Sequence, residues 1–272
     1  MIVRALTILS LLGIPAYSSA SASIDPIGDW RIEPSEARCV VTRSFGDTKN
    51  PTTLALKAPP TGKALQLAII RPAYRKTSSQ VGAKVGIDGK TFDTLALGYP
   101  SSFPKASKTS VTLIHLPAEA IEALHGGRSM SVSAVGSVNE TFPLGDIAKA
   151  WSALNDCLSR LRQAWNLDDD GRNSLVSDAK PLVPFEGMLS PRDFPPQAMS
   201  KPWSGTTKFL LLVDEKGIVR DCTLAESSGI AVIDSRTCAI ISYKARFDPA
   251  IGPGNKPVKS AVARSITWRV IF

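Results

Sequence analysis

Short apolar runs and turn residues alternate in the last third of the chain. Residues 208–213 form an apolar run that is too short for a helix, and the Asp-Glu-Lys-Gly that follows at 214–217 is a turn signal. A second run, 218–225, begins at once, so the two runs predict a β-hairpin. The Ser-Ser-Gly at 227–229 then ends the second strand.

A helix is predicted after the hairpin. Cys238, Ile241 and Ala245 recur at spacings of three and four residues, which places one apolar stripe along about three helical turns. Asp234 is the candidate N-cap, because its side chain can accept a hydrogen bond from a free backbone N–H at the start of a helix. Asp248-Pro249 cannot continue the helix.

The last residues have the two-residue period of a strand with one buried face. The apolar face would carry Val262, Ile266, Trp268, Val270 and Phe272. The other face would carry Ala263, Ser265, Thr267 and Arg269. Arg264 is the exception, because it is a charged residue at an apolar position.

The first half of the chain is predicted to be rich in strands. β-favouring runs separated by turn residues occur at 39–43, 64–70, 81–87, 111–116 and 129–135. This regular spacing is typical of a β-sandwich or barrel. Helical spacing predicts a short helix at 118–124 and a longer closing helix at 147–165. The whole chain is therefore predicted to be α+β.

Several features of the C-terminal part agree in order and spacing with a known family. They are Phe194-Pro195, the hairpin with Gly217, the spacing from Cys222 to Cys238, the Ala-Arg-Phe-Asp-Pro turn at 245–249 and the final Trp-Arg-Val at 268–270. Residues 184–272 thus resemble the C-terminal domain of TonB-family proteins, in particular its cysteine-bearing subgroup. The resemblance implies about three antiparallel strands packed with one or two helices.

The N-terminal part has a weaker resemblance. Leu116-Pro117 to Gly127, the Phe-Pro-Leu-Gly at 142–145 and the order of elements resemble periplasmic β-domains of the invasion-associated locus B type. An unrelated β-rich domain is the alternative interpretation. We expect a β-rich domain at 23–165, a polar, proline-rich linker at 166–183 and a TonB-like domain at 184–272.

Residues 1–22 have the pattern of a secretory signal peptide. Arg4 precedes an apolar stretch at 5–16, and Ala20-Ser21-Ala22 is a small-residue cleavage signal. Cleavage after Ala22 would leave a periplasmic protein. The alternative is an uncleaved anchor in the inner membrane, but a spanning helix needs about 20 apolar residues, and Pro15 interrupts this stretch. Membrane contact is expected only if the segment is retained.

The chain is basic, with a net charge of +8. Cleavage would remove Arg4 and no acidic residue, which leaves +7. Basic residues form no dense run, so nucleic acid is not an expected partner. The charge fits a solvated basic surface, or attraction to an anionic envelope polymer or lipid headgroups.

The chain has four cysteines, and outside the cytoplasm these favour disulfides, for which three pairings exist. The resemblance implies that Cys222 pairs with Cys238. Pairing within each predicted domain then joins Cys39 to Cys157. A zinc site is the rival interpretation, but the chain has no Cys-x-x-Cys, and its two histidines are far from the cysteines in sequence.

Catalytic motifs are not found in the sequence. His115 and His125 lie in no His-Glu-x-x-His pattern, and neither a Gly-x-Ser-x-Gly elbow nor a phosphate-binding Gly-Lys-Ser/Thr occurs. Residues 166–171 resemble the start of a calcium loop, but Ser177 stands where the bidentate Glu is needed. We therefore predict a non-enzymatic protein without cofactor or metal.

The TonB resemblance implies a site for an extended peptide on the last strand. There, the N-terminal box of an outer-membrane transporter would add as a further strand. The candidate binding residues by position are Val262, Arg264, Ser265, Thr267 and Arg269. A membrane-anchored energy transducer is one alternative function, and an envelope enzyme or enzyme inhibitor that acts through the N-terminal domain is the other.

Overall fold

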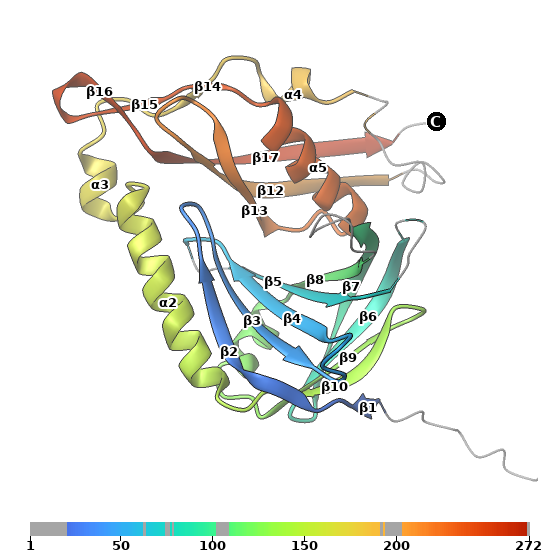
Figure 1. The fold of residues 1–272 in the computed structure, drawn as a ribbon. Coiled ribbons are helices and arrows are strands. Elements are labelled where there is room, and N and C mark those ends of the chain that lie inside the picture. Colours follow the sequence, from blue (N-terminus) through green and yellow to red (C-terminus); the bar gives the residue numbers. More distant parts are fainter. Residues whose placement is uncertain are drawn as a thin grey trace, which may run out of the picture.

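The fold is α+β and is built around two main sheets (Figure 1). A computed structural model describes residues 21–61, 64–73, 77, 79–101, 109–190, 193 and 203–270. The predicted signal peptide, Phe194-Pro195 and Phe272 therefore lie wholly or mostly outside the described residues. The helices are α1 (Ala118–Leu124), α2 (Ile147–Ala164), α3 (Asp169–Asn173), α4 (Phe185–Met188) and α5 (Ala231–Lys244), with a 3-10 turn at Pro253–Asn255.

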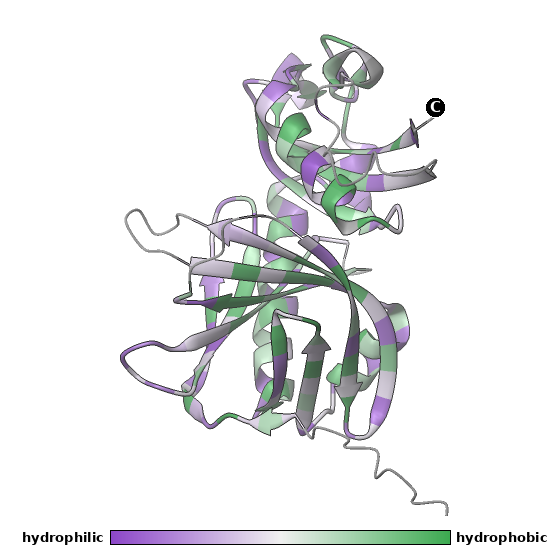
Figure 2. Ribbon diagram, turned by 90° about the vertical axis from the view of Figure 1, so that its right-hand side faces the viewer, coloured by the Kyte–Doolittle hydropathy of each residue, from purple (hydrophilic) through white to green (hydrophobic). Residues whose placement is uncertain are grey.

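The N-terminal part forms one ten-stranded sheet with the order β1-β10-β9-β6-β7-β8-β5-β4-β3-β2. Its strands are β1 (Ala22–Ser23), β2 (Pro26–Pro34), β3 (Cys39–Phe45), β4 (Thr52–Ala58), β5 (Leu65–Arg71), β6 (Ser79–Ile87), β7 (Lys90–Ser101), β8 (Thr109–Leu116), β9 (Ser129–Ala134) and β10 (Val138–Pro143). The sheet curls on itself, and apolar and polar residues alternate along its strands (Figures 1 and 2). It is a single open, barrel-like sheet, so the sandwich interpretation is wrong.

Helix α2 closes the curled sheet. Its apolar stripe, with Leu154, Leu158 and Leu161 buried, packs against β2 and β3. The Cys39–Cys157 disulfide links β3 to this helix. The predicted helices at 118–124 and 147–165 are both confirmed within one residue.

The C-terminal part forms a three-stranded antiparallel sheet with the order β13-β12-β17. Its strands are β12 (Trp203–Val213), β13 (Val219–Glu226) and β17 (Ser260–Val270). Two small sheets pair β11 (Lys180–Pro181) with β14 (Phe247–Asp248) and β15 (Ala250–Gly252) with β16 (Lys256–Val258). The Cys222–Cys238 disulfide joins β13 to α5, so both predicted pairings are confirmed.

Gly217 makes the β12–β13 turn possible. Its φ of +72° suits glycine, and a Cβ here would lie 1.8 Å from the carbonyl oxygen of Phe247. Asp214 Oδ1 accepts hydrogen bonds from the backbone N–H groups of Lys216 and Ile218. The predicted hairpin turn is therefore confirmed, and it also contacts the chain that follows α5.

Asp234 is not the N-cap of α5, so that prediction is wrong. The helix begins at Ala231, one turn earlier. The buried Asp234 carboxylate instead accepts hydrogen bonds from Thr207 Oγ1, Ser227 Oγ and the Ser228 backbone N–H. It ties the start of α5 to β12 and to the loop after β13. An acidic residue in a first helical turn suits either role, and the sequence does not distinguish them.

The three-stranded sheet packs against the N-terminal part. Leu212 is buried in the core of the ten-stranded sheet, and Ala261 packs beside it. Asp221 on β13 is 8% exposed, and its carboxylate lies 2.9 Å from Lys57 Nζ on β4. Gln80 Oε1 on β6 accepts a hydrogen bond from the backbone N–H of Val232 in α5.

We expect the two disulfides to contribute unequally to stability. They span 118 and 16 residues, and in the chain-entropy model the longer loop restricts the unfolded chain more. Replacing Cys39 and Cys157 with alanine should lower the free energy of unfolding by about 5 kcal/mol, and replacing Cys222 and Cys238 by about 3 kcal/mol. Denaturant unfolding followed by circular dichroism measures both. The reverse ranking would contradict this account.

Candidate protein-binding edge

β17 is a terminal strand of the three-stranded sheet. It pairs with β12 over its whole length, from Ser260 opposite Val213 to Val270 opposite Trp203. The face toward α5 carries the buried Val262, Ile266 and Trp268. The indole N–H of Trp268 donates to Thr237 Oγ1 on α5 at 3.0 Å. The strand is thus held on one face by the core.

The five candidate binding residues fall into three groups along β17. The Val262 side chain is 5% exposed and belongs to the core, so only its backbone could meet a partner. Ser265, Thr267 and Arg269 are exposed on the face away from α5. Thr267 also makes a hydroxyl–hydroxyl hydrogen bond of 2.9 Å with Thr206 on β12.

Arg264 has the apolar-face parity and is nevertheless exposed. One of its guanidinium nitrogens donates to the carbonyl oxygen of Ala263 at 2.8 Å, which folds the side chain back along the strand. Arg264 and Arg269 therefore place positive charge on opposite faces of β17. The predicted alternation, including this exception, is confirmed for the side chains that the structure describes.

The opposite edge of the sheet, β13, faces the N-terminal part (Figure 1). Asp221 on this strand contacts Lys57 and lies 4.0 Å from Arg38 Nε. Arg220 lies 3.9 Å from Glu36. The two edges are therefore not equivalent, because β13 forms ion pairs with the N-terminal part, whereas β17 meets that part near its start, at Ala261. The sequence carries no pattern that identifies these long-range partners.

His115 lies between the two sheets. It lines a cavity of about 310 Å³ together with Leu65, Leu224 and Glu226. Gln66 Nε2 lies 2.8 Å from His115 Nε2, which suits an amide donating to a neutral ring. Burial lowers the pKa of His115 below its ordinary value of 6.5, and the negative charge of Asp234 offsets part of that shift.

Among the described residues, no group of three or more His, Cys, Asp or Glu side chains is arranged to hold a metal ion. Two acidic residues from the calcium-like segment have local partners. Asp168 Oδ1 accepts from the backbone N–H of Gly171 and caps α3, while Asp169 pairs with Arg172. The His125 ring packs against Trp151, with ring centroids 4.1 Å apart and ring planes tilted by 44°.

The described part of the chain contains no helix that is both long and apolar enough to span a membrane. The described residues begin at Ser21. The choice between a cleaved signal peptide and a retained anchor therefore stays a prediction.

Residues 190–270 match the family model described as the Gram-negative bacterial TonB protein C-terminal. The C-terminal part of this chain is thus similar to TonB C-terminal domains. The match confirms the predicted resemblance and covers α5 and all three strands of the small sheet. It supports a TonB-like envelope protein with a protein partner. A search of curated proteins found no match for the chain.

We expect acid to destabilise the protein through His115. Its folded-state pKa is lowered, so the unfolded state takes up the proton first as the pH falls below about 6.5. This contribution to stability is present above the unfolded-state pKa and is lost progressively toward the lowered folded-state pKa. His115→Gln should therefore flatten the fall in the urea midpoint between about pH 7.5 and 5.

The matched control is His125→Gln, which removes the exposed histidine of the chain. This variant should keep the pH dependence of the parent protein. If the urea midpoint of His115→Gln falls with pH as steeply as that of the parent protein, His115 does not set the acid sensitivity.

Proposed function

We propose that this protein is a non-enzymatic periplasmic binding protein that captures an extended peptide by strand addition at β17. The single observation that carries the proposal is the position of β17 as the terminal strand opposite the packed β13 edge. A terminal strand can pair its outer backbone groups with those of another chain. β17 has 11 residues, long enough for several such pairs.

Side chains next to that edge would select the peptide. On the face away from α5, the added strand would meet Ser265, Thr267 and Arg269. On the other face it would meet Arg264. Positive charge on both faces favours a peptide with acidic residues, because complementary charges steer encounter and fix register. The N-terminal segment of an outer-membrane transporter is the first candidate partner, and another envelope protein is the second.

A membrane-anchored energy transducer is the second candidate function, because the TonB family match is compatible with it as well. The two functions differ in the fate of the N-terminal residues. Mass spectrometry of the mature protein should find a chain that begins at Ser23 if the protein is periplasmic. A chain that retains residues 1–22 would instead favour the transducer.

Strand addition predicts a specific pattern of backbone dependence in the peptide. Successive N–H groups of a strand point to opposite edges, so only every second amide of the peptide would pair with β17. Two peptides N-methylated at complementary alternate positions are titrated into the full chain, with fluorescence anisotropy as the readout. N-methylation at one set of alternate positions should abolish binding, and N-methylation at the other set should be tolerated.

Charge selection is tested with protein variants. Arg264→Ala and Arg269→Ala should each weaken binding of an acidic peptide about 2- to 5-fold, the effect expected for exposed charges at a rim. Arg160→Ala, at an exposed position on α2, is the matched control and should bind like the parent. Equal effects of both methylated peptides, or binding unaffected by both β17 variants, would contradict this mode of capture.

A further inference from the structure

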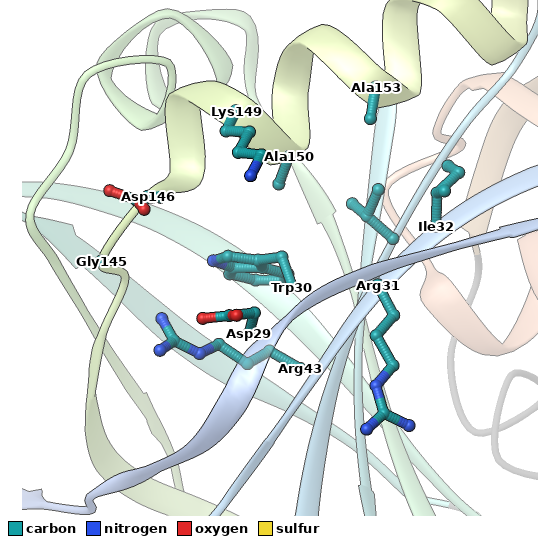
Figure 3. A pocket seen from close by; sticks show the side chains of 11 residues that line it. Asp29, Trp30, Arg31, Ile32, Arg43, Gly145, Asp146, Lys149, Ala150 and Ala153 are labelled. Carbon is teal, nitrogen blue, oxygen red and sulfur yellow. The ribbon is translucent and has the colours of Figure 1, made fainter.

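A second candidate site lies in the N-terminal part, away from β17. It is a cavity of about 300 Å³ between β2, β3 and the start of α2 (Figure 3). Its polar lining comes from Asp29, Arg31, Arg43, Asp146 and Lys149, and Trp30 lies among them. Farther along, the lining is apolar and includes Ile32, Val41, Ala150 and Ala153.

The wall of this cavity is held in place by backbone groups. The β2–β3 register shifts between Ile27 and Arg31, an irregularity of the kind that redirects side chains next to functional sites. The Trp30 indole N–H donates to the carbonyl oxygen of Leu144 at 2.7 Å. The half-buried ring is therefore fixed before any ligand arrives.

Arg43 is fixed in the same way. Its Nε donates to the Gly28 carbonyl at 2.9 Å, and its Nη1 donates to the same Leu144 carbonyl at 2.9 Å. Gly145 has a φ of +56°, and a Cβ there would lie 2.6 Å from Arg43 Nη1. The chain thus uses a glycine where the guanidinium needs the space.

The acidic and basic side chains that line the cavity attract ions of opposite charge. Figure 3 shows Lys149 reaching from α2 toward Trp30, with Asp29 and Arg43 on the other side of the ring. Asp146 precedes α2 but makes no side-chain capping hydrogen bond. A simple anion would be repelled by the two carboxylates, and a simple cation by Arg43 and Lys149.

We propose that this cavity binds a saccharide. A sugar hydroxyl both donates and accepts, so a ring on the α2 side of Trp30 can donate to Asp146 and accept from Lys149. The apolar C–H face of the ring can pack on Trp30, because the face of an aromatic ring is negative and attracts weakly positive C–H groups. The apolar end of the cavity suits a methyl-bearing substituent such as an acetamido group.

The size of the cavity agrees with a small ligand, since about 300 Å³ is at the lower end of ligand pockets. One or two sugar rings are the expected length. This site lies in the N-terminal part, so the proposal stands independently of peptide capture at β17.

The test uses the full chain and the β1,4-linked disaccharide of N-acetylglucosamine, with cellobiose as the probe that lacks acetamido groups. Isothermal titration calorimetry gives the affinity, and saturation-transfer NMR shows which sugar protons contact protein. The disaccharide should bind more tightly than cellobiose. Trp30→Ala should weaken binding at least about 10-fold, and Lys149→Ala, which changes an exposed side chain, about 2- to 5-fold.

Trp151→Ala is the matched control, because Trp151 is another partly exposed tryptophan that lies on α2 and packs against His125, and it does not line the cavity. It should bind like the parent chain. Thermal melts establish whether each variant is folded. If Trp30→Ala does not fold, Lys149→Ala still tests the proposal. No saccharide binding, equal binding by parent and Lys149→Ala, or binding of a free zwitterionic amino acid instead would overturn the proposal.

Discussion

The TonB-like sheet is joined to the N-terminal part at the buried carboxylate of Asp221. At 8% exposure it has lost most of its hydration, and that loss must be offset by nearby charge and hydrogen bonds. Lys57 Nζ lies 2.9 Å away on the other sheet, and Thr223 Oγ1 donates at 2.8 Å. The Thr223 bond lies within β13, whereas the Lys57 contact forms only while β13 lies against β4. Leu212 adds apolar contact at the same junction.

This constraint makes the two edges of the small sheet different. Exposed sheet edges invite pairing with other chains, and proteins commonly cover them. Here β13 lies against the N-terminal part, whereas β17 is the other terminal strand and meets that part near its start, at Ala261. The packing therefore leaves β17 as the candidate strand for pairing with a partner chain. The N-terminal part also has its own cavity around Trp30, so the chain combines two separate candidate sites.

Local patterns in the sequence predict most of the fold. The helices at 118–124 and 147–165, the Gly217 turn and the alternation on β17 follow from periodicity and turn chemistry, which are properties of neighbouring residues. The pattern does not distinguish the two roles of Asp234, because helix capping and tertiary hydrogen bonding need the same residue type. The Lys57–Asp221 contact and the cavity around Trp30 join segments far apart in the chain. The spacing of residues within one segment does not predict contacts between distant segments.

The central claim is that β17, and not β13, receives the partner strand. Amide hydrogen exchange of the full chain, measured with and without an acidic transporter-derived peptide, tests it most directly. Protection should increase along Ser260–Val270, where new backbone hydrogen bonds form, while β13 should stay unchanged. Protection that increases on β13, or at neither strand while the peptide is bound, would contradict the account.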